Sequence, residues 1–546
     1  MKIAVVGAGC SGIVALKYLL DTYPETDIVC FEKSHSVRGC WGNQRPDFVS
    51  TSTKYTTQFS CFRKWSPDVA TEQKFKEFYR GNEFGDYLEA FATHFNLRTH
   101  IRFGVELQHL EWIDSCWSLL LVENGKEELL TFDAVFLCTG LVNQKVPFRS
   151  TAIPIAEGPE GIRNATVVVV GGGESAADVA NDLAKPVHNN TTFLSLRSGI
   201  RVSPRYHPIR GLPSDFLRNR LLLSFDKGVR NWVGERFVTF RIRFNRLLAR
   251  WFPHQRASSH PNDQAQALRR EWDLKLKARA KGGLFNVFHN KSDDFLDAVA
   301  EKRLQIIGPP KDEQWADYFD FDLTTTLHLS PDILVWSTGY RSHLSDLSGG
   351  AIQLKDFYQG CVHTDRHNLF LIGFARPIIG NIPSISEIQV QYAIGVLSGK
   401  YTLPTRLKER QQEAWNLLCA EYGTINTENV YPVEQFPYCD ALAKEMGSMP
   451  TIATVKSLRT WLKIMFTPAS TIHYVDKYFD KQSIERQKVH TPVILLALLT
   501  LMRLLGYPLR LIKRVRNIKI TLSSRSCYRR TRSILHTIFS SRKNMP

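Results

Sequence analysis

The clearest hydrophobic pattern in this chain lies at its start, where the apolar run 2–6 breaks into a glycine-rich turn and then a helical segment. The turn has the spacing Gly-x-Gly-x-x-Gly, formed by Gly7, Gly9 and Gly12. A second apolar run, 27–32, ends in Glu32, 20 residues after the last of these glycines. The pattern predicts a pyrophosphate over the turn and a ribose hydroxyl on the Glu32 carboxylate. A turn that binds nothing is the alternative, and the order of strand, turn, helix and acid disfavours it.

The same pattern returns after residue 165, where the apolar run 165–170 leads into a second turn and a helical segment. This turn has the spacing Gly-x-Gly-x-x-Ala, and its predicted cofactor-binding residues are Gly171, Gly173, Ser175 and Ala176. The strand that follows ends in Arg197, 21 residues beyond the turn. A cation at this place accommodates a 2′-phosphate, so the second nucleotide is predicted to be NADPH. A solvated arginine at a strand end is the alternative.

Two dinucleotide folds in one chain predict that one cofactor is resident and the other delivers hydride to it. The resident cofactor of the first fold, with its acidic ribose ligand, is predicted to be FAD. The expected fold class is α/β, with two Rossmann-like domains built on doubly wound parallel sheets and the second inserted in the first. We expect FAD-binding parts at 1–160 and 326–445, an NADPH-binding domain at 161–325, and a C-terminal helical region at 446–546.

Charge is unevenly distributed along the chain. Residues 486–546 hold fourteen Lys and Arg and no Asp or Glu, and residues 197–281 hold twenty against six, so the remainder is mildly acidic. Within a basic insertion at 199–285, the segment 233–251 places aromatic and basic residues on different helical faces. This pattern is typical of a membrane-surface helix, although a helix packed on the protein's own core would show it too.

The tail pairs an apolar run with basic residues. Residues 492–502 carry no charge, and basic residues follow from Arg503 onward. The run is short for a membrane span, which favours association of 490–520 with an anionic lipid surface without spanning it. Nucleic-acid binding is the competing interpretation, disfavoured because the basic residues adjoin an apolar run. No signal peptide is recognisable, so we expect a membrane-associated protein on the cytosolic face, at the endoplasmic reticulum in a eukaryote.

The ten cysteines are scattered, without Cys-x-x-Cys or a cluster with His at metal-ligand spacing. No metal site and no disulfide scaffold is predicted. The absence of a redox-active Cys pair also disfavours a thiol reductase.

Several motifs, in order over about residues 1–400, resemble those of the flavin-containing monooxygenases, the class B enzymes that use FAD and NADPH. Gly39 and Trp41 match the family's turn beside the flavin, and 337–340 matches its Ala-Thr-Gly-Tyr strand end with Ser in place of Ala. Thr338 and Gly339 are therefore expected at a cofactor. The segment 387–391 is similar to the family's Glu-x-Gln-x-Arg, with Gln at its last position.

The resemblance implies that NADPH reduces the flavin, that O2 adds to give a C4a-hydroperoxide, and that one oxygen passes to a small amine or sulfide. It departs from the family pattern twice. Residues 139–164 contain no His, whereas the family's identifying segment carries one there, and Lys54 stands where the family has its active-site Asn. A cation there would stabilise negative charge developing near the flavin, and a surface lysine in a polar loop is the alternative.

Two other functions stay open at this point. One is a Baeyer–Villiger-type oxygenase acting on a carbonyl, which shares both folds. The other is a catalytically inactive, membrane-bound flavoprotein that serves as a binding module. The sequence makes no prediction of oligomeric state.

Overall fold

The computed structural model divides into two contact units, Met1–Lys488 and Val489–Pro546. The residues that it describes are 1–42, 44–64, 75–142, 144–145, 153–156, 158–206, 211–231, 268–269, 271–273, 275–277, 289–309, 318–320, 326–422 and 430–504.

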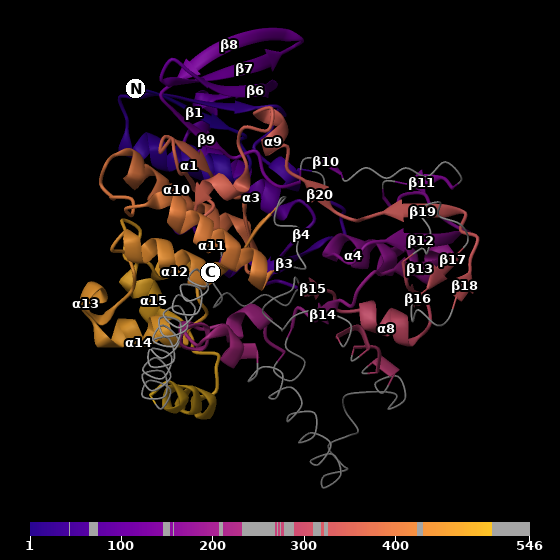
Figure 1. Ribbon diagram of the computed structural model, residues 1–546. Helices are drawn as coiled ribbons and strands as arrows, with labels where there is room; N and C mark the ends of the chain where they lie inside the picture. Colours follow the sequence, from indigo (N-terminus) through magenta and orange to yellow (C-terminus); the bar gives the residue numbers. More distant parts are fainter. Residues whose placement is uncertain are drawn as a thin grey trace, which may run out of the picture. The chain divides into compact units, whose positions relative to one another are not determined.

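A seven-stranded sheet in the order β21-β22-β23-β9-β1-β2-β5 forms the centre of the N-terminal part (Figure 1). Its strands are β21 (Phe357–Tyr358), β22 (Val362–His363), β23 (Leu369–Leu371), β9 (Ala134–Leu137), β1 (Lys2–Val6), β2 (Asp27–Glu32) and β5 (Ile101–Phe103). The five strands from β23 to β5 run parallel, and β21 and β22 are antiparallel additions at one edge. The first strand–turn–helix–strand prediction is confirmed, because α1 (Cys10–Thr22) lies between β1 and β2.

Helix α1 packs beside α10 (Ile382–Leu397), a pairing that Figure 1 shows clearly. Buried apolar side chains of both helices, including Ile13, Leu16, Ile385 and Ile388, share one core with the sheet. The chain therefore returns to its first fold almost 400 residues later to complete it. Helix α1 and helix α10 each need the other, together with the sheet, to bury their apolar faces.

The remaining elements of this part flank the sheet. An antiparallel sheet consists of β6 (Val105–Ile113), β7 (Cys116–Glu123) and β8 (Lys126–Phe132). The next segment carries β3 (Val49–Thr53), α2 (Lys54–Thr57), β4 (Phe78–Arg80) and α3 (Glu83–His94), and α3 places Phe84, Leu88 and Phe91 in the core. The short elements are η1 (Gly39–Trp41), η2 (Leu97–His100), α9 (Leu344–Leu347), η6 (Leu354–Asp356), β24 (Ala375–Ile379) and β25 (Tyr431–Glu434).

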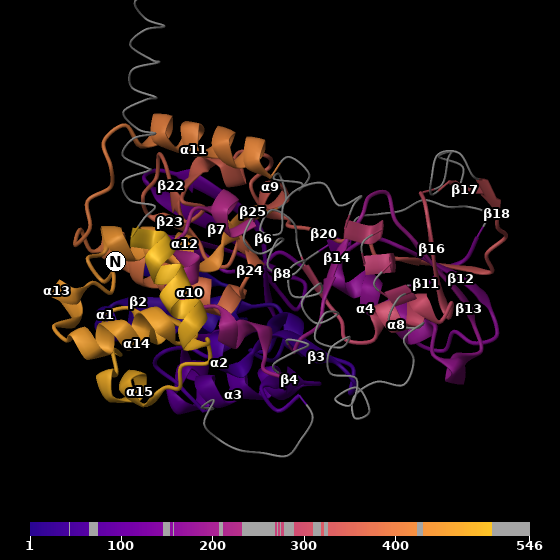
Figure 2. The same ribbon diagram turned by 90° about the horizontal axis from the view of Figure 1, so that it is seen from below.

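A second parallel sheet has the order β11-β19-β12-β13-β16. Its strands are β11 (Ile155–Ala156), β19 (Ile333–Trp336), β12 (Thr166–Val170), β13 (Thr191–Ser195) and β16 (Leu304–Ile307). Helices α4 (Glu174–Leu183) and α8 (Phe295–Ala300) lie beside it in both ribbon views (Figures 1 and 2). Strand β19 was expected in the returning part of the first fold, from residue 326, but it pairs with β12. A buried apolar strand looks the same in either sheet, so its pattern could not assign it.

The other short elements of residues 186–328, outside this sheet, are η3 (Pro186–His188), β14 (Arg201–Ser203), η4 (Ser214–Leu217), α5 (Arg220–Leu223), β15 (His289–Lys291), β17 (Tyr318–Asp320) and β18 (Thr326–His328). Two connecting strands, β10 (Gln144–Lys145) and β20 (Tyr340–Arg341), pair antiparallel. The Arg341 guanidinium also donates to the Gln144 side chain at 2.8 Å. The chain thus leaves and re-enters the first part through paired strands.

The C-terminal helices of the first unit are α11 (Leu407–Glu421), α12 (Gln435–Glu445), α13 (Ile452–Val455), α14 (Leu458–Phe466), η7 (Thr471–His473) and α15 (Lys481–Arg486). Ser457 caps the N-terminus of α14, because its side chain accepts a hydrogen bond from the Thr460 amide. The unit Met1–Lys488 includes all of these helices together with both parallel sheets, so the expected boundary at 445 stays a prediction.

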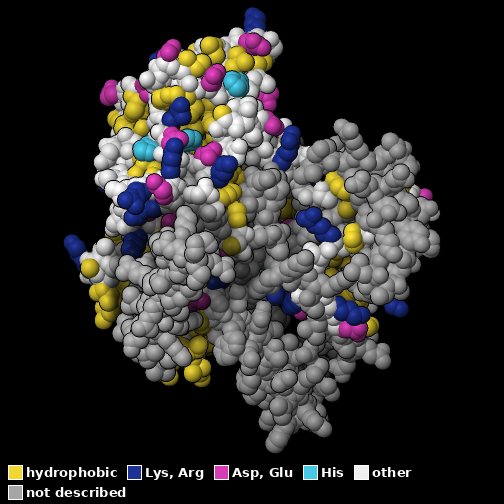
Figure 3. Space-filling view, in the orientation of Figure 1, with side chains coloured by type: hydrophobic (Ala, Val, Ile, Leu, Met, Phe, Trp, Pro, Cys, Tyr) yellow, Lys and Arg dark blue, Asp and Glu magenta, His cyan; other side chains and the backbone are white. Residues whose placement is uncertain are grey.

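Among the described residues, no helix has the length and apolar character needed to cross a bilayer. Residues 493–504 are helical. The predicted amphipathic helix at 233–251 and the tail beyond 504 lie outside the described residues. On the face shown in Figure 3, the described Lys and Arg side chains are interspersed with Asp and Glu and form no single basic patch.

Candidate functional site

The first glycine turn is compressed between β1 and α1. Gly7 has φ of +92°, and a Cβ there would lie 2.7 Å from the Cys138 carbonyl oxygen. A Cβ on Gly12 would lie only 1.7 Å from the Gly7 carbonyl oxygen. These two glycines let the helix start directly against the strands, as the sequence predicts.

Gly9 and Gly39 face each other across the turn. A Cβ on Gly9 would lie 3.6 Å from the Gly39 Cα, and Gly39 itself has φ of +53°. Trp41 follows in η1, with its ring centroid 5.0 Å from Phe84 and 5.8 Å from Phe48. Two bare backbones beside an aromatic side chain form the kind of surface that a pyrophosphate and a flavin can approach closely.

Glu32 lies at the end of β2, where its side chain is buried. Its Oε2 accepts a hydrogen bond from the Ala8 amide at 2.7 Å, and its Oε1 accepts one from the Ser34 amide at 2.8 Å. The carboxylate therefore fixes the turn to the neighbouring strand. Each oxygen keeps a further lone pair, so a ribose hydroxyl can still donate to it.

Sequence reasoning missed several residues around this turn. Gly373, with φ of +84°, has no room for a side chain because a Cβ would lie 2.2 Å from the Ser11 hydroxyl. Ser11 in turn bonds Ser386 of α10 at 2.8 Å, and the Gly373 amide donates to Gln389 at 2.9 Å. Gln389, in the segment 387–391, was the only one of these with a family motif as its signal. The Thr139 hydroxyl is buried without a hydrogen-bond partner among the described residues, as expected for a group that meets a ligand.

The second turn repeats the compression with alanine at its last position. Gly171 has φ of +145°, and a Cβ there would lie 2.2 Å from the Ser337 carbonyl oxygen and 3.2 Å from the Ala176 Cβ. Ala176 is fully buried, while Gly173 would place a Cβ in space free of described atoms. Ser175 is exposed in the first turn of α4. The turn thus packs closely on its inner side and leaves its outer side open to a phosphate.

Arg197, Thr338 and Gly339 lie at the ends of strands in this second sheet. Arg197 follows β13, is exposed, and forms no ion pair with any described residue. Thr338 and Gly339 follow β19, and both are exposed. Their neighbour Ser337 contacts the second turn, so these residues belong beside the second nucleotide turn and not the first.

Two carboxyl groups of α4 lie in surroundings that favour their protonated form. Burial raises the pKa of Glu174 to about 6, although Arg376 opposes the shift. Burial likewise raises the pKa of Asp178 to about 6, against Arg205. A carboxyl group with a pKa of about 6 is still mostly ionised at neutral pH, and a phosphate arriving at the start of the helix would favour its protonation.

Lys54 lies at the start of α2, and its side chain is 18% exposed. Its Nζ forms an ion pair with Glu83 Oε2 at 2.9 Å and lies 5.5 Å from the Tyr79 ring centroid. The backbone amide of Lys54 donates to the Glu77 carbonyl at 2.7 Å. The lysine is therefore neither a freely solvated surface residue nor an unpaired cation, and its catalytic role stays a prediction.

The sheets and the two turns define an α/β oxidoreductase with places for two nucleotide cofactors. The profile of the flavin-binding monooxygenase-like family matches residues 1–287, more than half of the chain, and the protein belongs to this family. It is a flavin monooxygenase that uses FAD and NADPH, and the open backbone at Gly9 and Gly173 fits both cofactors.

Two curated relatives span most of the chain. The 4-hydroxybenzoate brominase (decarboxylating) of Marinomonas mediterranea is 26% identical over 506 residues, covering 87% of this chain and 89% of that protein. Dimethylaniline monooxygenase (N-oxide-forming) 2 of Mus musculus is 25% identical over 512 residues, covering 87% and 88%. The crystal structure of cyclohexanone monooxygenase from Rhodococcus sp. Phi1 bound to NADP⁺ matches with a TM-score of 0.53 at 16% identity, covering 82% and 97%. That structural likeness shows the fold.

Proposed function

We propose that this flavin monooxygenase transfers one oxygen atom of O2 to a nucleophilic nitrogen or sulfur centre of a small molecule, with NADPH as the reductant. The observation that carries the proposal is the pairing, in one chain, of an acid-ended first fold at Glu32 with a cation-ended second fold at Arg197. This is the arrangement expected of a resident FAD and an exchangeable NADPH. The N-oxide-forming activity in the name of the mouse relative supports the choice of nucleophile.

Each named residue then has a defined task. Gly9 and Gly39 would leave room for the FAD pyrophosphate, and Glu32 would accept the ribose hydroxyl. Gly173 and the amides that open α4 would hold the NADPH pyrophosphate, and Arg197 its 2′-phosphate. The bound cofactors supply the hydride transfer and the activation of oxygen.

Lys54 is the proposed catalytic residue. Its ammonium group would stabilise negative charge that develops next to the isoalloxazine ring, in place of an amide hydrogen bond. The ion pair with Glu83 limits this effect, because the carboxylate already neutralises much of the charge. We therefore expect Lys54 to contribute fully only where Glu83 turns away.

The deciding experiment uses the purified full chain with bound flavin. NADPH consumption, hydrogen peroxide release and product formation are measured with a tertiary amine, a thioether and a cyclic ketone. Substrate-stimulated NADPH consumption with an N-oxide or sulfoxide as product supports the proposal. Lactone or ester formation from the ketone alone would replace it with Baeyer–Villiger oxygenation, the activity class to which the matched cyclohexanone monooxygenase structure points by name.

Flavin that stays bound without NADPH oxidation in any of these assays would instead support a binding module. Comparing NADPH with NADH as the reductant tests the cofactor assignment independently of the substrate. NADPH should be preferred over NADH whichever substrate is accepted, because Arg197 acts on the 2′-phosphate alone.

We also propose that the C-terminal segment associates with an anionic membrane surface on the cytosolic side. Support comes from apolar side chains that are more than half exposed in the helical residues 493–504, namely Val493, Ile494, Leu498, Leu501 and Leu504. Basic residues follow in the sequence. Cosedimentation with phosphatidylserine vesicles, but not with phosphatidylcholine vesicles or duplex DNA, is the expected result. Equal binding to DNA would favour the nucleic-acid interpretation.

A further inference from the structure

The short strand β15 touches both halves of the cofactor machinery through two adjacent residues. The Asn290 amide is 2% exposed and donates to the Gly172 carbonyl oxygen at 3.0 Å, inside the second glycine turn. Lys291, the next residue, donates from Nζ to the Thr51 carbonyl oxygen at 2.5 Å and pairs with Asp215 Oδ1 at 2.9 Å. Successive side chains of a strand point to opposite faces. One strand therefore holds the nucleotide turn on one side and β3 on the other.

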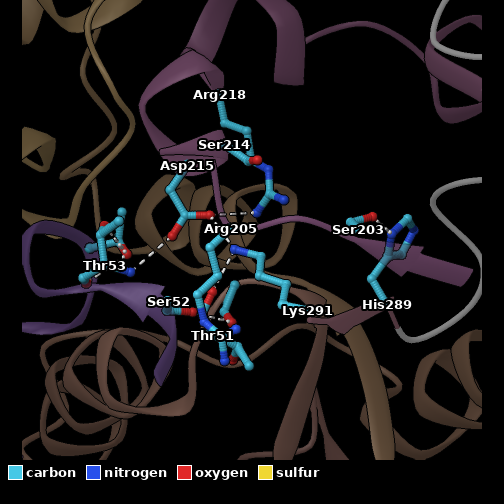
Figure 4. A network of polar contacts seen from close by, with 12 residues as sticks. Thr51, Ser52, Thr53, Ser203, Arg205, Ser214, Asp215, Arg218, His289 and Lys291 are labelled. Carbon is cyan, nitrogen blue, oxygen red and sulfur yellow. Dashed lines mark hydrogen bonds and ion pairs between the residues drawn. The ribbon is translucent and has the colours of Figure 1, made fainter. Parts of the chain in front are cut away.

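Asp215 completes the link to the segment that carries Lys54. Figure 4 shows the Asp215 carboxylate between Lys291, Arg218 and the Thr53 backbone. Its Oδ2 accepts a hydrogen bond from the Thr53 amide at 3.0 Å, and Thr53 is the residue from which α2 begins. Burial works to raise the pKa of Asp215, but Lys291 and Arg218 outweigh it and lower the pKa to about 2. The carboxylate is therefore charged at any physiological pH.

Arg205 holds the first residues of β3 in the same manner. Its Nε donates to the Ser50 carbonyl oxygen at 3.1 Å, and a terminal nitrogen donates to the Val49 carbonyl oxygen at 2.6 Å. Asp293, two residues beyond Lys291, pairs with the same guanidinium at 3.1 Å. The backbone of β3 from Val49 to Thr53 is thus held by charged side chains from the region around the second sheet. A sheet edge with only water as partner would be much less constrained.

We propose that β15 is a coupling strand, in which Asn290 responds to the nucleotide at the second turn and Lys291, with Asp215, sets the position of β3 and Lys54. A nucleotide bound by the Gly171–Gly173 turn fixes the Gly172 carbonyl. Asn290, which donates to that carbonyl, is then held in place, and so is the adjacent Lys291. Asn290, Lys291 and Asp215 are positioning residues, since none of them needs to touch a reacting atom. The inference rests on the proposed NADPH site, and it adds a means by which that site is linked to the flavin side.

The test measures amide hydrogen exchange of the flavin-loaded full chain with and without NADP⁺. In the wild type we expect NADP⁺ to increase the protection of peptides covering 49–57 at least threefold. Lys291→Met removes the ammonium group and keeps much of the side-chain volume, so this increase should disappear while NADP⁺ still binds within about threefold of wild-type affinity. Lys291→Arg should restore at least part of it. Lys275→Met is the matched control, because Lys275 is exposed and its Nζ contacts, among the described residues, only the nearby Glu271 carboxylate and Trp272 ring.

Asn290→Ala provides a second route to the same answer, since it interrupts the path at the nucleotide turn. Here both the protection of 49–57 and the fraction of NADPH electrons recovered in product should fall, the latter about threefold or more. Unchanged NADP⁺-dependent protection in Lys291→Met and Asn290→Ala, or none in the wild type, would overturn the coupling. If the Asn290 and Lys291 contacts had only a structural role, both variants would have a lower melting temperature but would keep the NADP⁺-dependent protection of 49–57. Protection is measured without substrate, so a failed oxygenation assay leaves this result interpretable.

Discussion

Gly12 offers the sharpest test of how the first turn is built, because the space for its side chain is already taken. A methyl group in Gly12→Ala would sit 1.7 Å from the Gly7 carbonyl oxygen, and real Cβ contacts essentially never fall below 3.0 Å. The obstacle is backbone, not a side chain that can rotate away. Helix α1 must therefore move by more than an ångström relative to β1, which also moves the amides that would face the pyrophosphate.

The magnitude follows from the cost of overpacking a buried site. Such insertions cost roughly 1–3 kcal/mol, and this one lies at the upper end because no flexible neighbour can yield. If most of that cost, about 2–3 kcal/mol, falls on the flavin-binding conformation, FAD affinity drops about 30- to 150-fold. Flavin content of the purified protein and titration of the apoprotein with FAD measure this directly.

Gly9→Ala is the matched control, because its methyl group would make an ordinary 3.6 Å contact with the Gly39 Cα. The apoprotein should keep its melting temperature, yet FAD binding should weaken because the methyl group would take up space proposed for the pyrophosphate. FAD affinity within twofold of wild type in Gly12→Ala would refute the packing argument. Equal loss of apoprotein stability in both variants would refute the assignment of Gly9 to the ligand.

Three further predictions concern charge. Arg197→Gln should raise the KM for NADPH about 10- to 100-fold and leave that for NADH within twofold, since only a 2′-phosphate contact is lost. Lys54→Met should lower the share of NADPH electrons found in product, whereas Glu83→Gln, which frees the ammonium group, should not; equal loss in both would point to a structural ion pair. Asp215→Asn should be less stable than wild type in urea at neutral pH. Since the folded pKa of about 2 lies below the unfolded value of about 3.9, this difference should shrink as pH falls from 4 toward 2, and a pH-independent difference would contradict it.

The two strand–turn–helix units were predictable because a short stretch of sequence determines each of them. Gly7 to Gly12 and Gly171 to Ala176 combine a strand, a turn and a helix start within a dozen residues, and both have the predicted form. The turn at 39–41 was located by a motif of the same length. Backbone conformation at a glycine and close packing of a helix on its strand are local requirements.

The assembly of those units was less predictable. Strand β19 has an apolar sequence that suits either sheet, and only its pairing with β12 assigns it. The Ser11–Ser386 hydrogen bond joins residues 375 positions apart, so neither serine carries a signal by itself. The roles of Asn290 and Asp215 likewise depend on hydrogen-bond partners in other elements, Gly172 and Thr53. Polar residues that bond distant backbone have no periodicity and no fixed spacing.

Lys54 shows how the two kinds of information combine. The family resemblance singled it out as a departure, but the sequence could not say whether its charge was free. Glu83 lies 29 positions away and pairs with it, while Asp215 fixes the backbone from which its helix starts. The lysine is thus neutralised by the first fold and positioned from the region around the second. Movement of Glu83 would change the effective charge of this cation, and movement of Asp215 would change its position; in our proposal, nucleotide binding acts on Asp215 through β15.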